Sequence, residues 1–335
     1  MQTRPVSDCV HCHICRRECA FLSKYEIDIG DTEKLRELAF HCFLCGKCTE
    51  VCPLHIDGRQ VVLDLRAERV DSGEKAQIIK DYKGLVREKK DYVYRNWKHA
   101  SEGCVFFPGC NFPSMYPKTT AAISRMLAEH GIGTVYECCG KPIAELGLVE
   151  EEKQIIERIK SRLYDNKITE IVTGCPNCRA FFGDRLGVKV TGIFSKFTEL
   201  GIGSRVDGDF LFYLPCPDRV EKKWIEEIRP FINGRIDFIE GVECCGLGGS
   251  AIKYESDIAE SFADKLKDRC AAQPGGNCNP DSGNRSIVTY CASCTGRFKR
   301  SGFGEIDHIL TKVSGTNEAP DTAKSYINRV LTRFK

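Results

Sequence analysis

Eight cysteines near the start of the chain have the spacing of metal ligands. They form two runs, Cys9-x2-Cys12-x2-Cys15-x3-Cys19 and Cys42-x2-Cys45-x2-Cys48-x3-Cys52-Pro53. Three closely spaced thiolates suit one face of a [4Fe–4S] cube, and in two-cluster domains the fourth cysteine binds the other cube. We therefore assign Cys9, Cys12, Cys15 and Cys52 to one cluster, and Cys42, Cys45, Cys48 and Cys19 to the other. Zinc also binds thiolates, but its structural sites usually combine two CxxC pairs.

Ten further cysteines form an internal repeat. Cys110, Cys138 and Cys139 recur 106 positions later as Cys216, Cys244 and Cys245. Cys175-x2-Cys178 recurs 116 positions later as Cys291-x2-Cys294, and the ten extra residues fit a surface loop, "CAAQPGGNCNPDSGN". Each repeat has five cysteines, one more than a cube or a zinc ion uses. Because a thiol with a pKa of about 8.5 is mostly protonated at neutral pH, clustered thiols of this kind predict a bound metal. Gly140 and Gly246 follow the adjacent pairs and permit a turn that aims both sulfurs at one cofactor.

Composition excludes several other classes of protein. The chain has 335 residues, 21 cysteines and a net charge of +2, without a long basic run, so we expect no nucleic-acid partner. Its first residues, "MQTRPVSDCVHCHICRREC", lack an apolar stretch typical of a signal peptide. No later apolar run is long enough for a transmembrane helix. A reducing cytoplasm with metal-bound thiolates therefore fits better than a secreted disulfide scaffold.

The elements around the cysteines indicate a multidomain α+β and α/β fold. Helical patterns lie between and after the N-terminal runs, as in "DTEKLRELAFHC", and predict an all-helical two-cluster ferredoxin-type domain and charged linker over 1–100. "CVFFPGC" and "FLFYLPC" read as buried strands, while "ITEIVTGCPNC" and "RSIVTYCASC" read as strands that lead into CxxC turns. Alternation with helices predicts two pseudo-symmetric α/β domains with small parallel sheets, over 101–207 and 208–335. Ligands of such sheets lie beyond the carboxyl ends of the strands, where these cysteines fall.

The motif Cys…Cys-Cys-Gly…Cys-x-x-Cys, present twice, resembles the cysteine-rich CCG domain family. That family includes the disulfide-reducing subunit of heterodisulfide reductase and iron–sulfur subunits of anaerobic dehydrogenases. The resemblance covers nearly the whole sequence, and the fused N-terminal module resembles a variant that combines electron entry and catalysis. It implies that each CCG motif holds a noncubane [4Fe–4S] cluster, so that two cubane and two noncubane clusters are expected. The substrate disulfide would then lie between the two noncubane clusters.

Two functions and one structural alternative remain open at this stage. The first is an oxidoreductase, working alone or as a subunit, that reduces a disulfide or similar thiol-linked substrate. The second is an electron-transfer subunit that links a flavoprotein dehydrogenase to quinone or ferredoxin. The third has zinc in a CCG site. We expect a flavoprotein, a ferredoxin or a membrane cytochrome as partner in a complex, and a cytoplasmic location, peripheral to the membrane at most through that partner. The sequence identifies no catalytic residue beyond the cluster ligands.

Several other residues receive narrower predictions. Three cysteines outside the motifs, Cys104, Cys270 and Cys278, are expected not to bind iron. His11, His13 and His41 are interpreted as solvated because the cysteine ligands are already complete. Four cations that follow motif cysteines could bind an anionic disulfide substrate or serve only solubility: Lys141, Arg179, Arg297 and Lys299. "GLGGS" after Cys245 indicates close backbone packing more than phosphate binding. "TAKSYINRVLTRFK" predicts a terminal helix, either solvated or touching a partner or membrane.

Overall fold

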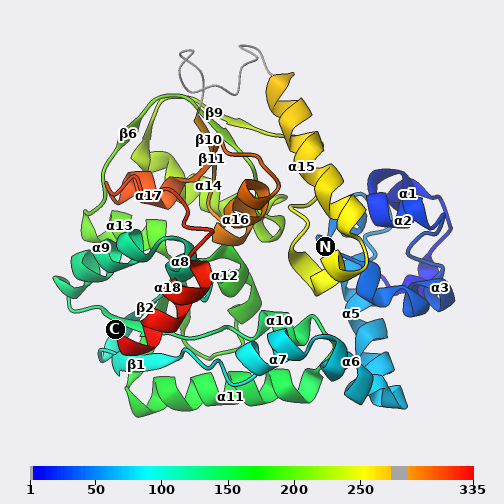
Figure 1. Cartoon of the computed structure of the whole chain (residues 1–335), viewed down its shortest axis with the longest axis horizontal. Coiled ribbons are helices and arrows are strands. Elements are labelled where there is room, and N and C mark those ends of the chain that lie inside the picture. Colours follow the sequence, from blue (N-terminus) through cyan, green and yellow to red (C-terminus); the bar gives the residue numbers. More distant parts are fainter. Residues whose placement is uncertain (1–2, 273–285) are drawn as a thin grey trace. The chain divides into compact units, whose positions relative to one another are not determined.

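The computed structural model describes residues 3–272 and 286–335, and the chain forms two compact units (Figure 1). The first unit consists of Met1–Lys90, Pro142–Glu152 and Gly241–Lys265. The second consists of Asp91–Lys141, Lys153–Glu240 and Leu266–Lys335. Segments that follow both adjacent cysteine pairs therefore belong to the same unit as the N-terminal runs. Cys278 and most of the predicted surface loop lie outside the described residues.

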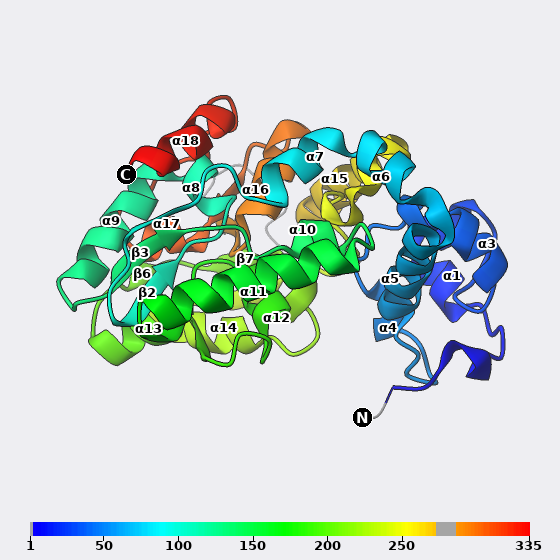
Figure 2. The same cartoon turned by 90° about the horizontal axis from the view of Figure 1, so that it is seen from below.

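The first unit is helical. Its described residues contain no β-strand and only one isolated bridge, between Arg4 and Ile56. The helices of its N-terminal part are η1 (Val6–Asp8), α1 (Ile14–Glu18), α2 (Ala20–Lys24), α3 (Thr32–Glu37), η2 (Ala39–His41), α4 (Lys47–Glu50), α5 (Gly58–Arg69), η3 (Val70–Glu74), α6 (Lys75–Asp81) and α7 (Lys83–Lys89). Figure 2 shows α1, α3 and α4 gathered around α5. The later segments add parts of α10 (Lys141–Ala144), α11 (Val149–Asp165) and α15 (Ser256–Ala271), together with η6 (Gly248–Lys253).

Local sequence explains why α5 starts where it does. The Asp57 side chain caps the helix by accepting hydrogen bonds from the backbone N–H groups of Arg59 and Gln60, both at 3.1 Å. A carboxylate at this position satisfies donors that have no partner within the helix. Val62 and Leu65 then fall on one face and are buried in the core of the unit.

The segment 241–265 packs into the core of the first unit. Phe43 and Phe262 make an edge-to-face ring contact with centroids 5.3 Å apart. Cys244 and Ala259 belong to the same buried cluster and are fully shielded from solvent. Burial of apolar side chains contributes roughly 1.5–3 kcal/mol for each large residue, so this segment is an integral part of the helical unit.

The second unit contains two main sheets. The first has the order β1-β3-β2-β4-β5, in which only β1 is antiparallel to its neighbour. Its strands are β1 (Asn96–His99), β2 (Gly103–Phe107), β3 (Gly133–Tyr136), β4 (Ile168–Thr173) and β5 (Lys189–Gly192). The second sheet is all parallel in the order β11-β10-β7-β9. Its strands are β7 (Phe210–Phe212), β9 (Ile236–Phe238), β10 (Ser286–Thr289) and β11 (Ile306–His308).

The two sheets have the same topology, which supports the internal repeat. Without β1, the first sheet runs β3-β2-β4-β5, and the second, read from its other edge, runs β9-β7-β10-β11. The first strand of each repeat therefore lies between the second and third. A small pair, β6 (Val206–Asp207) and β8 (Ile232–Asn233), is separate from both sheets. Figure 1 shows β9, β10 and β11 close to one another.

Helices complete the second unit and share one core with both sheets. They are α8 (Phe112–Met115), α9 (Pro117–Ala128), α12 (Pro176–Phe182), α13 (Ile193–Leu200), η4 (Cys216–Asp218), α14 (Lys223–Ile228), η5 (Arg229–Phe231), α16 (Ala292–Arg300), α17 (Ile309–Val313), α18 (Ser325–Leu331) and η8 (Thr332–Phe334). A single buried cluster contains Phe106 and Val172 from the first sheet and Phe212 and Val288 from the second.

Most predicted elements are confirmed, with one addition. Each strand predicted ahead of a motif cysteine is present as β2, β4, β7 or β10. The charged stretch that was expected to be a solvated helix or linker contains α6 and α7, but it ends in the strand β1. Lys98 and His99 of this edge strand are both exposed, and charged edge strands resist pairing with other chains. The fold is thus a mixed multidomain one, while the three-part division 1–100, 101–207 and 208–335 stays a prediction.

The predicted terminal helix is present as α18, and it packs within the second unit. Asn328 Nδ2 donates to the backbone carbonyl of Ser114 at 3.1 Å, and Arg329 donates to Asn111 Oδ1 at the same distance. Tyr326 and Ile327 remain largely exposed. Across 3–272 and 286–335, every helix is too short or too polar to span a bilayer.

Candidate metal centres

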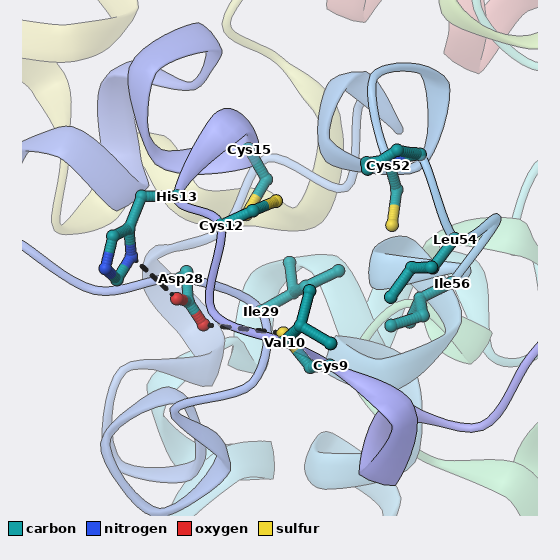
Figure 3. A pocket seen from close by; sticks show the side chains of 11 residues that line it. Cys9, Val10, Cys12, His13, Cys15, Asp28, Ile29, Cys52, Leu54 and Ile56 are labelled. Atoms are coloured by element: carbon teal, nitrogen blue, oxygen red, sulfur yellow. Dashed lines mark hydrogen bonds and ion pairs between the residues drawn. The ribbon is translucent and has the colours of Figure 1, made fainter.

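Cys9, Cys12, Cys15 and Cys52 surround one hollow in the first unit (Figure 3). The hollow is partly open and spans about 300 Å³ of space that no atom fills, open solvent included, and Ile29, Leu54 and Ile56 supply part of its apolar lining. Two left-handed residues, His11 (φ 50°) and His13 (φ 58°), bend the chain between the first three cysteines. The four thiols assigned to one cluster from spacing alone therefore converge, a donor set that fits an iron–sulfur cluster.

A buried carboxylate lies beside this hollow. Asp28 is 1% exposed and accepts hydrogen bonds from Gly30 N–H at 2.8 Å, from His11 Nδ1 at 3.0 Å and from His13 Nδ1 at 2.8 Å. Its Oδ1 atom is 3.9 Å from Cys9 Sγ. Both imidazoles are about half exposed, as expected from sequence, whereas His41, also predicted to be solvated, is only 22% exposed because it pairs with the buried Glu255. Cys9, His11 and Asp28 also place donor atoms within 4.8 Å of one another, close enough to share a metal ion.

The second N-terminal set, Cys19, Cys42, Cys45 and Cys48, also comes together. Burial raises the pKa of Cys19, and the nearby Cys45 and Cys42 raise it further. The pKa of Cys48 is raised by burial first and then by the other three members of the set. Such thiols stay protonated without a metal and lose their protons when one binds. The backbone N–H of Leu44 donates to Cys42 Sγ at 3.3 Å, the kind of contact that cluster sulfurs receive.

All five cysteines of the first repeat gather in the second unit. They are Cys110, Cys138, Cys139, Cys175 and Cys178, and they follow the carboxyl ends of the adjacent strands β2, β3 and β4. Hydrogen bonds from Cys138 and Cys178 lower the pKa of Cys139 to about 5. The pKa of Cys175 is lowered by a hydrogen bond from Cys178, and the nearby Cys110 acts in the opposite direction on both Cys139 and Cys175.

Glycines leave room for these sulfurs. Gly109 has φ +79°, and a Cβ there would lie 3.1 Å from Cys178 Sγ and 3.3 Å from Cys175 Cβ. Gly140 has φ +92° and packs against Ile155, where a Cβ would approach to 3.0 Å. Tyr92 and Tyr94 pack around Cys138 in a small buried cluster. The cradle therefore fits a bulky thiolate-bound group and excludes side chains that would fill it.

The five cysteines of the second repeat divide between the two units. Cys216, Cys291 and Cys294 belong to the second unit and follow β7 and β10, as their counterparts follow β2 and β4. Cys244 and Cys245 belong to the first unit. Gly246, at φ +83°, allows a tight turn in which its N–H donates to Cys244 Sγ at 3.3 Å. A single centre made of all five stays a prediction.

Within the second unit, the two CxxC turns touch. Asn177, inside the first turn, donates from Nδ2 to Cys291 Sγ at 3.6 Å. Asn111, next to Cys110, donates to Ser293 Oγ at 2.7 Å. The repeats thus face each other through residues of their cysteine motifs. Sequence reasoning missed Asn111 and Asn177, although both stand inside or directly beside the motifs.

The glutamate of each ECCG motif is also buried. Glu137 is 1% exposed and lies 3.9 Å from Arg158 Nη2, while Trp97 Nε1 donates to it at 3.4 Å. Glu243 forms an ion pair with Lys265 Nζ at 2.8 Å. The opening glutamate therefore anchors the turn in both repeats, and burial raises the pKa of Glu137.

The cations singled out from sequence have different environments. Arg179 donates to Glu227 Oε1 at 2.7 Å and stacks on Trp224, so its charge is compensated. Lys299 donates to the backbone carbonyl of Gly304, and Arg297 donates to Ser301. Lys141 begins α10 directly after Gly140. Arg300 was not predicted, and its pKa is lowered by burial first and then by two nearby cations, Arg329 and Arg297.

Two cysteines outside the motifs, Cys104 and Cys270, and the glycine loop lie within the described residues. None of the 20 cysteines within 3–272 and 286–335 takes part in a disulfide. Cys104 packs against the shared core, and Cys270 is buried. Gly248 and Gly249 lie against the backbone carbonyls of Phe43 and Cys42, so closely that a Cβ atom at either glycine would clash. Close packing of the backbone is therefore the role that the structure supports for "GLGGS".

Known proteins resemble both the first repeat and most of the whole chain. Residues 104–183, which contain the first repeat, match the cysteine-rich domain family CCG. The chain is 25% identical over 364 aligned residues to a subunit of fumarate reductase (CoM/CoB) from Methanothermobacter marburgensis, covering 91% of this chain and 70% of the relative. The resemblance to CCG proteins inferred from the cysteine motifs is thereby confirmed.

Two further relatives are iron–sulfur proteins without a known activity. One, from Methanococcus maripaludis, is 24% identical over 274 residues, which is 72% of this chain and 55% of the relative. The other, from Methanocaldococcus jannaschii, is 24% identical over 288 residues, which is 77% of this chain and 56% of the relative. The chain thus spans little more than half the length of these two proteins. Together the relatives support an iron–sulfur protein.

Proposed function

We propose that this chain is an iron–sulfur oxidoreductase subunit. In this proposal, two N-terminal [4Fe–4S] clusters deliver electrons to cysteine-rich centres that reduce a disulfide or similar thiol-linked substrate. The observation that carries the proposal is the convergence of Cys110, Cys138, Cys139, Cys175 and Cys178 at the carboxyl ends of three adjacent strands. Five thiols exceed the four ligands of a zinc ion, which argues against zinc there.

The residues around the first centre would hold and shield the bound group. When bound, iron–sulfur clusters would supply the one-electron chemistry. The cysteines hold the metal as thiolates, and Gly109 keeps the adjacent space open. Tyr92 and Tyr94 pack against Cys138 and exclude water from that side. Asn177 donates to Cys291 and so joins the two repeats where both motifs meet.

The substrate class follows from nearby charge and from one relative. Arg297, Arg300 and Arg329 lie near one another, and Arg329 also contacts Asn111 beside Cys110. Guanidinium groups bind carboxylates, sulfonates and phosphates through paired hydrogen bonds. The name of one relative mentions CoM and CoB. We therefore propose an anionic thiol or its mixed disulfide, and we leave Arg179 out of this role because Glu227 already pairs with it.

An electron-transfer subunit is the second candidate. The direct contacts Asn177–Cys291 and Asn111–Ser293 favour it, because they join the two repeats without an intervening substrate. In that case a flavoprotein, a ferredoxin or a membrane cytochrome would exchange electrons with the chain as part of a complex. A cytoplasmic location, at most peripheral to a membrane through such a partner, belongs to both versions of the proposal.

Anaerobic purification followed by iron and sulfide analysis tests the cofactor part. About sixteen irons per chain would support four [4Fe–4S] clusters, whereas about eight irons with added zinc would favour zinc in the repeats. Electron paramagnetic resonance would then be recorded with the CoM–CoB mixed disulfide, with glutathione disulfide and without substrate. A signal that appears only with a disulfide, and is lost in Cys178→Ser but kept in Cys104→Ser, supports the reductase. Clusters that remain unaffected by every disulfide support the electron-transfer subunit.

A further inference from the structure

Two buried charges of opposite sign lie beside the two N-terminal cysteine sets. Arg66 is 0% exposed and Asp28 is 1% exposed. Arg66 contacts the backbone of Cys42, in one set, and Asp28 lies next to Cys9, in the other. Buried charges are rare without close compensation. The groups that contact Arg66 and Asp28 therefore determine how strongly each charge acts on the nearby cysteines.

Arg66 donates to backbone carbonyls only. Its Nε donates to Ala39 O at 3.0 Å, and Nη2 donates to Ala39 O and Cys42 O, both at 2.8 Å. Its Nη1 donates to Gly249 O at 3.0 Å and to Glu145 O. A guanidinium has five N–H donors, and all five are used here. None of these acceptors is a carboxylate, although the buried Glu145 side chain also interacts with Arg66 electrostatically.

The same contacts tie the Cys42 set to later parts of the chain. Glu145 follows Cys139 by six positions, and Gly249 follows Cys244 by five. Both segments meet the Cys42 backbone at Arg66 within the first unit. The Arg66 guanidinium also lies over the Phe40 ring, 4.8 Å from its centroid.

Each charge lies at short range from one cysteine set. Arg66 Nη2 donates to Cys42 O at 2.8 Å, and Asp28 Oδ1 is 3.9 Å from Cys9 Sγ. A cation favours added negative charge nearby, and a carboxylate disfavours it.

We propose that Arg66 and Asp28 set the order of the two N-terminal reduction potentials, with the higher potential at the cluster held by Cys19, Cys42, Cys45 and Cys48. Reduction adds one negative charge to a cluster, so a nearby cation raises the potential and a nearby carboxylate lowers it. An electron supplied by a flavoprotein or ferredoxin partner then moves from the Cys9 set, which is oxidised, to the Cys42 set, which is reduced. No bond changes and no proton needs to move.

Several other charged or titratable groups lie near the two sets. His11 and His13 pair with Asp28 and are about half exposed, and Arg59 adds positive charge near Cys42. Glu255 is fully buried and contacts His41, next to Cys42, but its Oε2 pairs with Lys24 Nζ at 2.7 Å. Beside the other set, Asp31 is more than one-third exposed. Exposure of Cys12 favours the added electron on the Cys9 set through solvation. In the proposed order of potentials, the effect of Arg66 and Asp28 is larger than this effect of solvation at Cys12.

The test is a redox titration of the intact, cluster-loaded chain followed by electron paramagnetic resonance. In Arg66→Met, one N-terminal signal should need a potential at least 59 mV lower, which is a tenfold change in the reduced-to-oxidised ratio of a one-electron couple. In Asp28→Asn, the other signal should move upward. Arg66→Lys keeps the charge and should keep the original potential, and the upward shift in Asp28→Asn tests the inference if Arg66→Met does not fold.

Arg69→Met is the matched control. Arg69 follows Arg66 by one turn and also faces Phe40, at 5.2 Å, but it is partly exposed and pairs with Glu74 at 2.5 Å. Its loss should change the ratio less than twofold. The inference rests on the proposed clusters, and a chain without N-terminal iron would refute those clusters first. If the clusters are present but Arg66→Met leaves both reduction potentials unchanged, the inference is wrong. It is also wrong if Arg66→Met and Asp28→Asn shift the potential of the same signal. Neither result would refute the proposed clusters.

Discussion

Replacing Glu255 by glutamine should loosen the start of α15 without removing any cluster ligand. Glu255 lies in the segment 241–265 and is fully buried. Its carboxylate accepts hydrogen bonds from Lys24 Nζ at 2.7 Å, from Tyr25 Oη at 2.6 Å and from His41 Nδ1 at 2.5 Å. These contacts join residues more than 200 positions apart in the sequence, and they are the polar counterpart of the apolar packing around Phe43.

The cost of the substitution follows from the acceptors that are lost. Glutamine keeps one acceptor oxygen and turns an NH₂ group toward either the Lys24 ammonium or the Tyr25–His41 pair. One hydrogen bond to a charged group contributes about 1.5–3 kcal/mol. Lys24 is 38% exposed, so solvent screening reduces its share. We expect the free energy of local opening to fall by about 1–2 kcal/mol after this reduction, which is roughly a 5- to 30-fold faster exchange at about 1.4 kcal/mol per factor of ten.

Hydrogen exchange measured by mass spectrometry on the anaerobic, cluster-loaded chain gives the readout. The sensitive amides lie at the start of α15, for example Ala259, whose N–H donates to Glu255 O at 3.0 Å. Asp257→Asn is the control, because Asp257 contacts the same Lys24 ammonium at 2.8 Å but is 63% exposed. This control should leave exchange unchanged. Less than threefold acceleration in Glu255→Gln, with iron content intact, would refute the argument that this carboxylate anchors the segment.

Three further predictions concern ligands, backbone and pH. Cys178→Ser should lose about four irons per chain, whereas Cys104→Ser, which alters a thiol packed against the core, should lose none by iron and sulfide analysis. Gly140→Ala should lower the thermal unfolding midpoint more than Gly131→Ala, because both positions have positive φ, costing about 1–2 kcal/mol, but only Gly140 also meets Ile155. Although burial raises the pKa of Glu255, hydrogen bonds from Lys24, Tyr25 and His41 outweigh it and keep that pKa below the usual 4.5. The stabilisation by Glu255 is therefore complete above pH 4.5 and is lost only as the pH falls through the lower pKa of Glu255 in the folded chain. Hydrogen-exchange protection factors of α15 should thus be constant from pH 8 to about pH 5.5 and fall only under stronger acid.

The sequence alone determined the local features of the candidate centres. Cysteine spacing within each run predicts which three thiols lie on one face of a cluster, and the hollow lined by Cys9, Cys12 and Cys15 also contains Cys52, the fourth thiol predicted from the other run. The repeat at fixed offsets predicted two sheets of one topology, and β3-β2-β4-β5 corresponds to β9-β7-β10-β11. Such features are readable because strand periodicity and ligand spacing depend on near neighbours in the chain.

Only the tertiary structure decided which distant segments and single charges belong together. Arg66 and Gly249 are 183 positions apart, and Arg179 meets its partner Glu227 across 48. An isolated arginine or aspartate carries no pattern in sequence, because its burial and partners depend on how helices and loops pack around it. The same packing places Cys244 in the buried core of the helical unit, whereas the repeat pattern grouped it with Cys216, Cys291 and Cys294. Local spacing thus specifies candidate ligands, whereas packing specifies the electrostatic environment in which they work.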